Sequence, residues 1–368
     1  MSVPDTTAPA AGAAMPDALH PRHLIVRVLE VLAVIAVVVV AISALPGLDD
    51  VKHRLQGADP AWVSAVVIAE LGSCAGYLLV FRATFCSQMS WALSYDIAMA
   101  ELAANSLLPA GGAGGLALGV WALRQAGMPT RHIAHRTVAF FVVTSAANFF
   151  ALIVVGVGVF IGIIAGRGSA VLSLVPAVVT AAGVMLVCLS PRLLRTLGER
   201  GAGGDHQAAG RLRLGVRAGL KVAADGVDEA ISLLRSHSTG VVIGSFAYMA
   251  CDIAALGAAF AAVGQVPPVG TLVLGYLIGQ LGNLIPVPGG IGGTEGALIG
   301  VFAIYGVSVP DATAAVLLYR LFQLLIPALL GAPAFVLLRR KLSRADQPAQ
   351  VCAPLAVDVV QLPSPSGP

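Results

Sequence analysis

The stretch Asn283-Leu-Ile-Pro-Val-Pro-Gly-Gly-Ile-Gly-Gly293 interrupts an apolar segment that extends from Thr271 to Tyr305. Proline and paired glycines remove helical backbone hydrogen bonds. Inside a bilayer, the freed backbone groups are tolerated only where they are buried in protein or face a wet cavity. The stretch therefore indicates a broken helix at membrane depth rather than an ordinary span.

A second apolar segment, from Tyr95 to Leu123, is interrupted in the same way by Asn105-Ser-Leu-Leu-Pro-Ala-Gly-Gly-Ala-Gly-Gly115. Asn105 and Asn283 lie 178 residues apart, and the glycine pairs repeat at that same offset. The pairs that match are Gly111 and Gly112 with Gly289 and Gly290. Two equal patterns at one offset indicate an internal repeat.

The composition excludes a soluble globular protein. Hydrophobic residues make up 57% of the 368 residues and charged residues only 11%, where a soluble domain carries about 25% charged residues. Several apolar runs reach the ~20 residues that cross a bilayer as a helix. We expect an all-α polytopic integral membrane protein with about six full spans, near 24–45, 60–82, 137–165, 171–190, 239–263 and 312–338.

Each break is either a kink in one span or the tip of a re-entrant hairpin. The arm from Tyr95 to Pro109 is about 22 Å long as a helix, and the arm from Gly112 to Leu123 is about 18 Å long. Neither arm crosses a hydrocarbon core of ~30 Å alone. Arm length therefore favours the hairpin.

The distribution of Lys and Arg tests this choice, because cytoplasmic loops are enriched in them. With two hairpins and a cytoplasmic N-terminus, 18 of these residues lie inside and three, Lys52, Arg54 and Arg167, lie outside. With two full spans instead, 8 lie inside and 13 outside. The hairpin topology is clearly favoured, and it places the N-terminus, the C-terminus and the 191–238 loop in the cytoplasm of a multi-pass cell-membrane protein.

In this topology the two hairpins enter from opposite faces, so the repeat is inverted, as in many secondary transporters. We expect a disordered cytoplasmic N-terminus at 1–23 and a membrane domain at 24–344, followed by a disordered Pro-rich tail at 345–368. Within the membrane domain, the first repeat covers about 60–165 and the second about 239–338.

The 191–238 loop contains apolar residues at steps of three and four, which predicts an amphipathic helix with a basic start. These residues are Leu212, Val216, Leu220, Ala223, Val227, Ile231 and Leu234. We expect this helix to dock on the inner membrane surface, and binding to a soluble cytoplasmic partner is the alternative.

Residues 283–298, NLIPVPGGIGGTEGAL, resemble the lysylphosphatidylglycerol synthase transmembrane-region family, also called flippase-like integral membrane proteins. The first break, followed by Leu123-Arg124-x-x-Gly127, resembles the N-terminal half of that family, so the likeness covers about residues 25–340. The resemblance implies movement of a lipid or lipid-linked compound between leaflets. In the best-known members a soluble domain aminoacylates phosphatidylglycerol. We expect that domain and its activity to be absent here, because the chain ends about 30 residues after the last span.

Ionisable groups inside spans are costly and usually functional. Glu295 follows the second glycine pair, and Arg320 lies eight residues into the last expected span, so the two side chains are expected to be close enough to pair. The pair is either a structural clamp or part of a substrate site, since Arg suits bidentate phosphate binding. Glu70 and Asp252, each alone in its span, raise a proton-coupled role as a further alternative.

Asn105 and Asn283 are expected to cap broken helix ends or to contact substrate, and the glycine pairs allow close backbone approach. The full set of candidate substrate-binding residues is Glu295, Arg320, Glu101, Asn105, Asn283, Gly111, Gly112, Gly289, Gly290 and Asp252.

The leading functional prediction is translocation of a phospholipid or lipid-linked substrate, with an anionic headgroup expected, and without covalent chemistry. The alternatives are a membrane-embedded lipid-phosphate enzyme and a non-transporting partner of a cell-envelope complex. No Walker loop, HExxH or GxSxG motif supports catalysis. The cysteines show no CxxC and no His at metal-ligand spacing, so we expect no metal and no cofactor, and no nucleic-acid partner.

Overall fold

The computed structural model describes residues 49–107, 113–166, 171–185, 224–235, 239–284 and 292–344. In these ranges the regular secondary structure is helical, without a strand. The expected span at 24–45, both expected terminal tails and residues 191–223 of the loop lie outside the described ranges.

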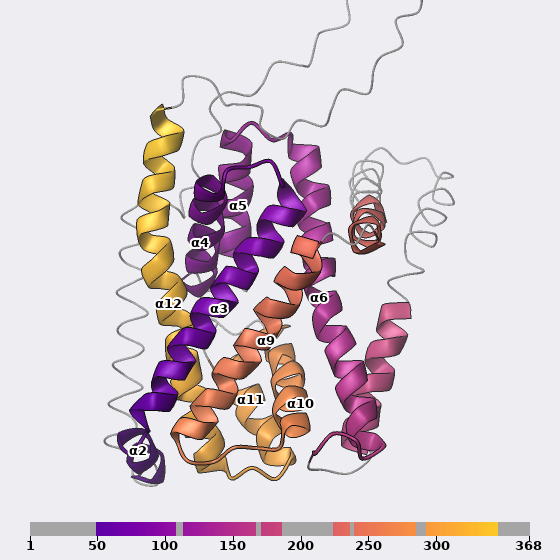
Figure 1. Ribbon diagram of the computed structural model, residues 1–368, viewed down its shortest axis with the longest axis vertical. Helices are drawn as coiled ribbons and strands as arrows, with labels where there is room; N and C mark the ends of the chain where they lie inside the picture. The colour runs from indigo at the N-terminus through magenta and orange to yellow at the C-terminus, as the bar shows by residue number, and fades with distance from the viewer. Residues whose placement is uncertain are drawn as a thin grey trace, which may run out of the picture.

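Four helices are long and apolar enough to cross a membrane, and they correspond to four of the expected spans. They are α3 (Pro60–Phe85), α6 (Thr130–Phe160), α9 (Thr239–Ala262) and α12 (Val309–Arg344). A shorter apolar helix, Val171–Met185, covers the described part of the expected 171–190 span. The described chain is therefore a helical bundle of the polytopic membrane type (Figure 1).

The bundle centres on the contact between α3 and α9. α3 begins at Pro60, which needs no N–H at the first helical position, and the Asp59 side chain accepts a hydrogen bond from the Ala61 N–H at 2.8 Å. A Cβ on Gly76 would lie 2.4 Å from the backbone N of Tyr248, and one on Gly244 would lie 2.5 Å from that of Val80. The helices are therefore antiparallel, and glycine permits their close approach.

The first interrupted segment forms α4 (Trp91–Leu107) and α5 (Ala113–Gln125), which pack on each other. Glu101 of α4 lies against Gly119 of α5, and Asn105 lies against Gly115. Since the residue number rises along one helix as it falls along the other, α4 and α5 are antiparallel. The segment folds back on itself instead of continuing as one kinked helix.

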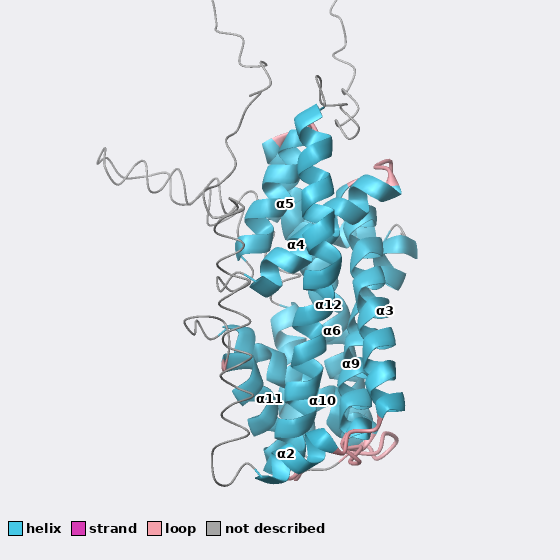
Figure 2. Cartoon of the chain, turned by 90° about the vertical axis from the view of Figure 1, so that its left-hand side faces the viewer, coloured by secondary structure: helices cyan, strands magenta, loops and turns pink. Residues whose placement is uncertain are grey.

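The second interrupted segment folds in the same way. It forms α10 (Val269–Gly279), the 3₁₀ helix η2 (Gln280–Leu284) and α11 (Gly293–Ile304). Gly275 lies against Phe302 and Gly279 against Leu298, so α10 and α11 are also antiparallel. In both views α4 and α5 lie at one end of the bundle, and α10 and α11 lie at the other (Figures 1 and 2).

The helix bounds follow the offset of 178 residues that relates the glycine patterns. α3, α4, α5 and α6 begin at residues 60, 91, 113 and 130, whereas α9, α10, α11 and α12 begin at 239, 269, 293 and 309, each within two residues of that offset. The packing follows the same correspondence, because α12 packs on α4 and α6 packs on α10.

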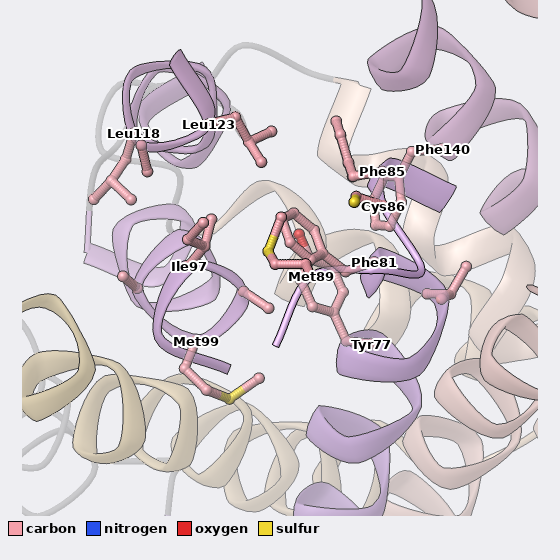
Figure 3. Packing of buried hydrophobic residues seen from close by; sticks show 14 of the residues in the cluster. Tyr77, Phe81, Phe85, Cys86, Met89, Ile97, Met99, Leu118, Leu123 and Phe140 are labelled. Atoms are coloured by element: carbon pink, nitrogen blue, oxygen red, sulfur yellow. The ribbon is translucent and has the colours of Figure 1, made fainter. Parts of the chain in front are cut away.

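Two apolar cores hold the helix pairs in place. One core surrounds α4 and α5 and includes Phe81, Ile97 and Leu123 (Figure 3). In this core the rings of Tyr77 and Phe140 make an edge contact, with their centroids 5.4 Å apart. The other core surrounds α10 and α11 and includes Leu274 and Phe302.

Short elements attach at both ends of the bundle. α2 (Asp49–Gln56) is held at one end by an ion pair between Arg54 and Asp311 of α12. At the other end, the helix at 224–235 packs on α6, where Arg136 pairs with Glu229 at 3.0 Å. Its buried face therefore contacts the protein itself, and the expected membrane docking of the 191–238 loop stays a prediction for the remaining residues.

Candidate functional site

Asp252 is the centre of a buried polar cluster where α9, α10 and α12 meet. Its side chain accepts a hydrogen bond from the Tyr319 hydroxyl at 2.8 Å, and another from the Tyr276 hydroxyl. Nε2 of Gln323 donates to both of its oxygens, at 3.3 and 3.2 Å. Asp252 is only 4% exposed, and a buried carboxylate is tolerated when several donors satisfy it.

Arg320 extends this cluster to the second helix pair. Its Nε donates to Oε1 of Glu295 at 2.7 Å, and its Nη1 donates to the Gln323 side chain. Gln323 therefore joins Asp252 to Arg320, and Arg320 joins α12 to α11. Tyr319 and Gln323 are four residues apart on α12, a spacing that places both on one face of the helix.

Glu295 lies in the first turn of α11, directly after the second break. Its Oε2 accepts a hydrogen bond from the Gly292 N–H at 2.8 Å. A carboxylate there satisfies a free amide of the helix start and lies at the positive end of the helix dipole. Gly292 has φ 103°, a value that favours glycine. The break itself thus positions the acid that holds Arg320.

The Arg320 and Glu295 side chains are more accessible than Asp252, with 15% and 13% of their side-chain surface exposed. A largely buried ion pair is stable only if its geometry is favourable and additional hydrogen bonds satisfy its remaining polar atoms. Here Gln323 and the Gly292 amide supply those extra bonds. Arg320 is thus a cation that is held in position and still partly open to a ligand.

Asn105 and Glu101 lie at the other helix pair. Oδ1 of Asn105 accepts a hydrogen bond from the Gly115 N–H at 3.0 Å, so Asn105 holds the start of α5 against the end of α4, as expected for a capping residue. Glu101 is 7% exposed and forms a side-chain hydrogen bond with Tyr77.

The structure therefore brings together Asp252, Glu295 and Arg320 from the expected set, and it places Glu101 and Asn105 apart from them. The four tip glycines, Gly111, Gly112, Gly289 and Gly290, and the side chain of Asn283 lie outside the described residues.

Sequence reasoning missed two tyrosines between these groups. Tyr248 lies one turn before Asp252 on α9, and its ring makes an edge contact with that of Tyr77 on α3 at a centroid distance of 5.5 Å. Tyr77 is also the residue that hydrogen-bonds Glu101. The signal available in the sequence was the four-residue spacing of Tyr248 and Asp252, which places both on one helix face.

Comparisons with known proteins agree with the fold. The model of the lysylphosphatidylglycerol synthase TM region matches residues 28–331 of this chain. A UPF0104 membrane protein from Methanothermobacter thermautotrophicus (strain Delta H) is 35% identical over 113 residues, which is 30% of this chain and 32% of that protein. The alignment thus spans about a third of the length of this relative. The chain is a membrane protein and belongs to the family of the lysylphosphatidylglycerol synthase transmembrane region.

Proposed function

We propose that this protein moves a lipid or lipid-linked compound with an anionic headgroup between the leaflets of the cell membrane. The observation that carries the proposal is the placement of Arg320, a partly exposed cation fixed by Glu295 and Gln323 where the second helix pair meets α12. Its described hydrogen bonds use Nε and Nη1, which leaves Nη2 for a phosphate oxygen. A planar guanidinium suits that contact.

We infer further that α4–α5 and α10–α11 are re-entrant hairpins that form an inverted repeat. Their short antiparallel arms support this, as do their positions at opposite ends of the bundle (Figure 2) and the offset of 178 residues in the helix bounds. In such a fold the substrate site lies near the bilayer midplane where the repeats meet. We infer that the cluster at Asp252 and Arg320 is this site.

The orientation proposed for the membrane rests on charge. Arg82 near the end of α3, Arg124 near the end of α5 and Arg339 near the end of α12 share one end of the bundle, whereas Lys52 and Arg54 of α2 lie at the other (Figure 1). The arginine-rich end is therefore the cytoplasmic end, and both termini are cytoplasmic in this proposal.

Leaflet exchange by the purified full chain in liposomes tests the function. Fluorescent phosphatidylglycerol is placed in both leaflets, and dithionite bleaches the outer one. Protein-dependent bleaching beyond about half of the probe supports transport. Fluorescent phosphatidylcholine is the zwitterionic control, and it should exchange more slowly because it carries no net negative charge for Arg320.

A matched pair of variants ties any exchange to the site. Arg320→Gln should abolish exchange of the anionic probe, whereas Arg339→Gln, on an exposed helix end, should leave it unchanged. Equal exchange by wild type and Arg320→Gln contradicts the proposal. Chemical change of the lipid instead of its movement, detected by mass spectrometry, favours the membrane-embedded enzyme.

A further inference from the structure

Glu70 of α3 and Asp252 of α9 lie at the same depth in the bundle. The Asp59 N–H, directly before α3, donates to the carbonyl of Ala262 at the end of α9 at 3.0 Å, so these two helix ends are level. Glu70 is ten residues from the start of α3, and Asp252 is ten residues from the end of α9. Each therefore lies about 15 Å from that end of the bundle.

The two helices are in direct contact at this level. A Cβ on Gly72 would lie 2.9 Å from Sγ of Cys251, next to Asp252 in the chain. The crossing leaves little room for water beside Glu70, whose residue surface is 3% exposed.

The two carboxyl groups differ in their hydrogen bonds. Asp252 accepts bonds from the side chains of Tyr276, Tyr319 and Gln323. Oε2 of Glu70, by contrast, is buried and has no hydrogen-bond partner among the described residues. An ionised carboxylate without partners is costly in such a place, and this cost favours uptake of a proton.

Two charged groups act electrostatically on Glu70, namely Asp252 of α9 and Arg320 of α12. The charge of Glu70 in turn acts on Cys74 of its own helix, on Tyr248 and Cys251 of α9 and on Tyr319 of α12. From α4, Glu101 interacts with Tyr77 instead. Arg320 is the cation in this set, and its bonds go to Glu295 and Gln323. Arg320 thus acts on Glu70 through its charge, and its hydrogen bonds go to other residues.

We propose that Glu70, beside Asp252, is a proton-binding site that couples lipid movement to a proton gradient. A phosphate on Arg320 offsets the positive charge near Glu70 and favours the O–H form. Departure of the phosphate restores that charge, the Glu70 O–H bond breaks, and the proton passes to bulk water. The anionic headgroup and one proton are therefore carried in the same direction. The coupling rests on the proposed function, whereas proton binding by Glu70 does not.

Infrared spectroscopy of the purified full chain tests proton binding without any transport. Protonated carboxyl groups absorb apart from carboxylates and shift in heavy water. Wild type should show a titrating component that Glu70→Gln lacks. Glu101→Gln removes another buried carboxyl with an unpartnered oxygen and is the matched control, which should keep the component. Retention of every titrating component in Glu70→Gln overturns the proposal.

Steady-state distribution of fluorescent phosphatidylglycerol tests the coupling. Liposomes carry a pH gradient, with the membrane potential clamped by valinomycin and equal potassium. One proton per lipid shifts the leaflet ratio of wild type by up to about tenfold per pH unit. Glu70→Gln should show no shift, whereas Arg339→Gln, at an exposed helix end, should respond like wild type. If wild type exchanges the lipid but its leaflet ratio does not change with the pH gradient, the coupling is wrong. Absence of any exchange overturns it together with the proposed function, and the infrared titration then still decides proton binding.

Discussion

Arg320 of α12 and Glu295 of α11 form an ion pair of 2.7 Å between Nε and Oε1, at the start of the helix that follows the second break. The pair fixes α11 to α12, and Gln323 links it to Asp252 on α9. Arg320 is therefore both the cation that we propose to bind the substrate and the residue that holds α11 to α12. Variants at position 320 must be judged by stability and by transport together.

We predict that Arg320→Ala lowers the free energy of unfolding by about 3 kcal/mol, because it leaves Glu295 as a buried charge without its cation. Arg320→Lys keeps the charge and loses the planar fork, so it should preserve stability better than it preserves transport. Thermal unfolding in detergent and leaflet exchange measure the two effects.

The double variant Glu295→Gln with Arg320→Gln is the control for the charge. It removes both charges and should unfold closer to wild type than Arg320→Ala does. If the double variant and Arg320→Lys both fold and transport normally, the pair is neither a clamp nor a binding site.

We predict that Asn105→Ala destabilises the α4–α5 pair by about 1 kcal/mol, because the Gly115 N–H loses its acceptor. Asn105→Asp retains a side-chain oxygen there and should be closer to wild type. Hydrogen exchange of amides in α4 and α5 reports the effect locally. Unchanged protection of the Gly115 amide in Asn105→Ala would show that this bond contributes nothing.

Sequence reasoning located the broken helices because their signals are local. Gly-Gly and Pro at membrane depth mark the breaks, and the short arms favour a chain that folds back, which the pairs Glu101–Gly119 and Gly279–Leu298 show. Hydropathy placed helix ends less well. α6 begins at Thr130 instead of 137 because Pro129 sets its start and polar residues such as Arg131 extend it beyond the apolar run.

Within the candidate site, the sequence predicted only the contact between residues that are near each other along the chain. Glu295 and Arg320 were expected to meet because both follow closely from the second break. The position of Glu70 beside Asp252 depends on how α3 crosses α9, and glycine contacts such as Gly76 against Tyr248 set that crossing. No spacing within a single helix contains this information, so the link between the two spans appears only in the packed structure.

We predict that Gly76→Val severely disturbs the α3–α9 crossing, since even a Cβ would lie 2.4 Å from the backbone N of Tyr248. Overpacking typically costs about 1–3 kcal/mol and more where backbone cannot move. Gly300→Ala is the control in α11, because a Cβ there meets nothing within 4 Å. Folded yield and unfolding temperature should fall for Gly76→Val and stay near wild type for Gly300→Ala. Equal values for the two variants would show that the close approach of α3 to α9 at Gly76 is not required for folding.

The proposed orientation predicts that the two ends of the bundle react differently with a membrane-impermeant maleimide on intact cells. Asp50 of α2 and Arg339 of α12 are both exposed, so burial does not bias the comparison. Because the arginine-rich end is assigned to the cytoplasm, Asp50→Cys should be labelled from outside. Arg339→Cys should be labelled only after the cells are opened.

The unmodified chain measures labelling of the native cysteines, and opened cells show that both introduced thiols can react. Labelling of Arg339→Cys in intact cells, with Asp50→Cys protected, would invert the topology. The inverted arrangement would place the α4–α5 hairpin on the outer face, contrary to the charge distribution.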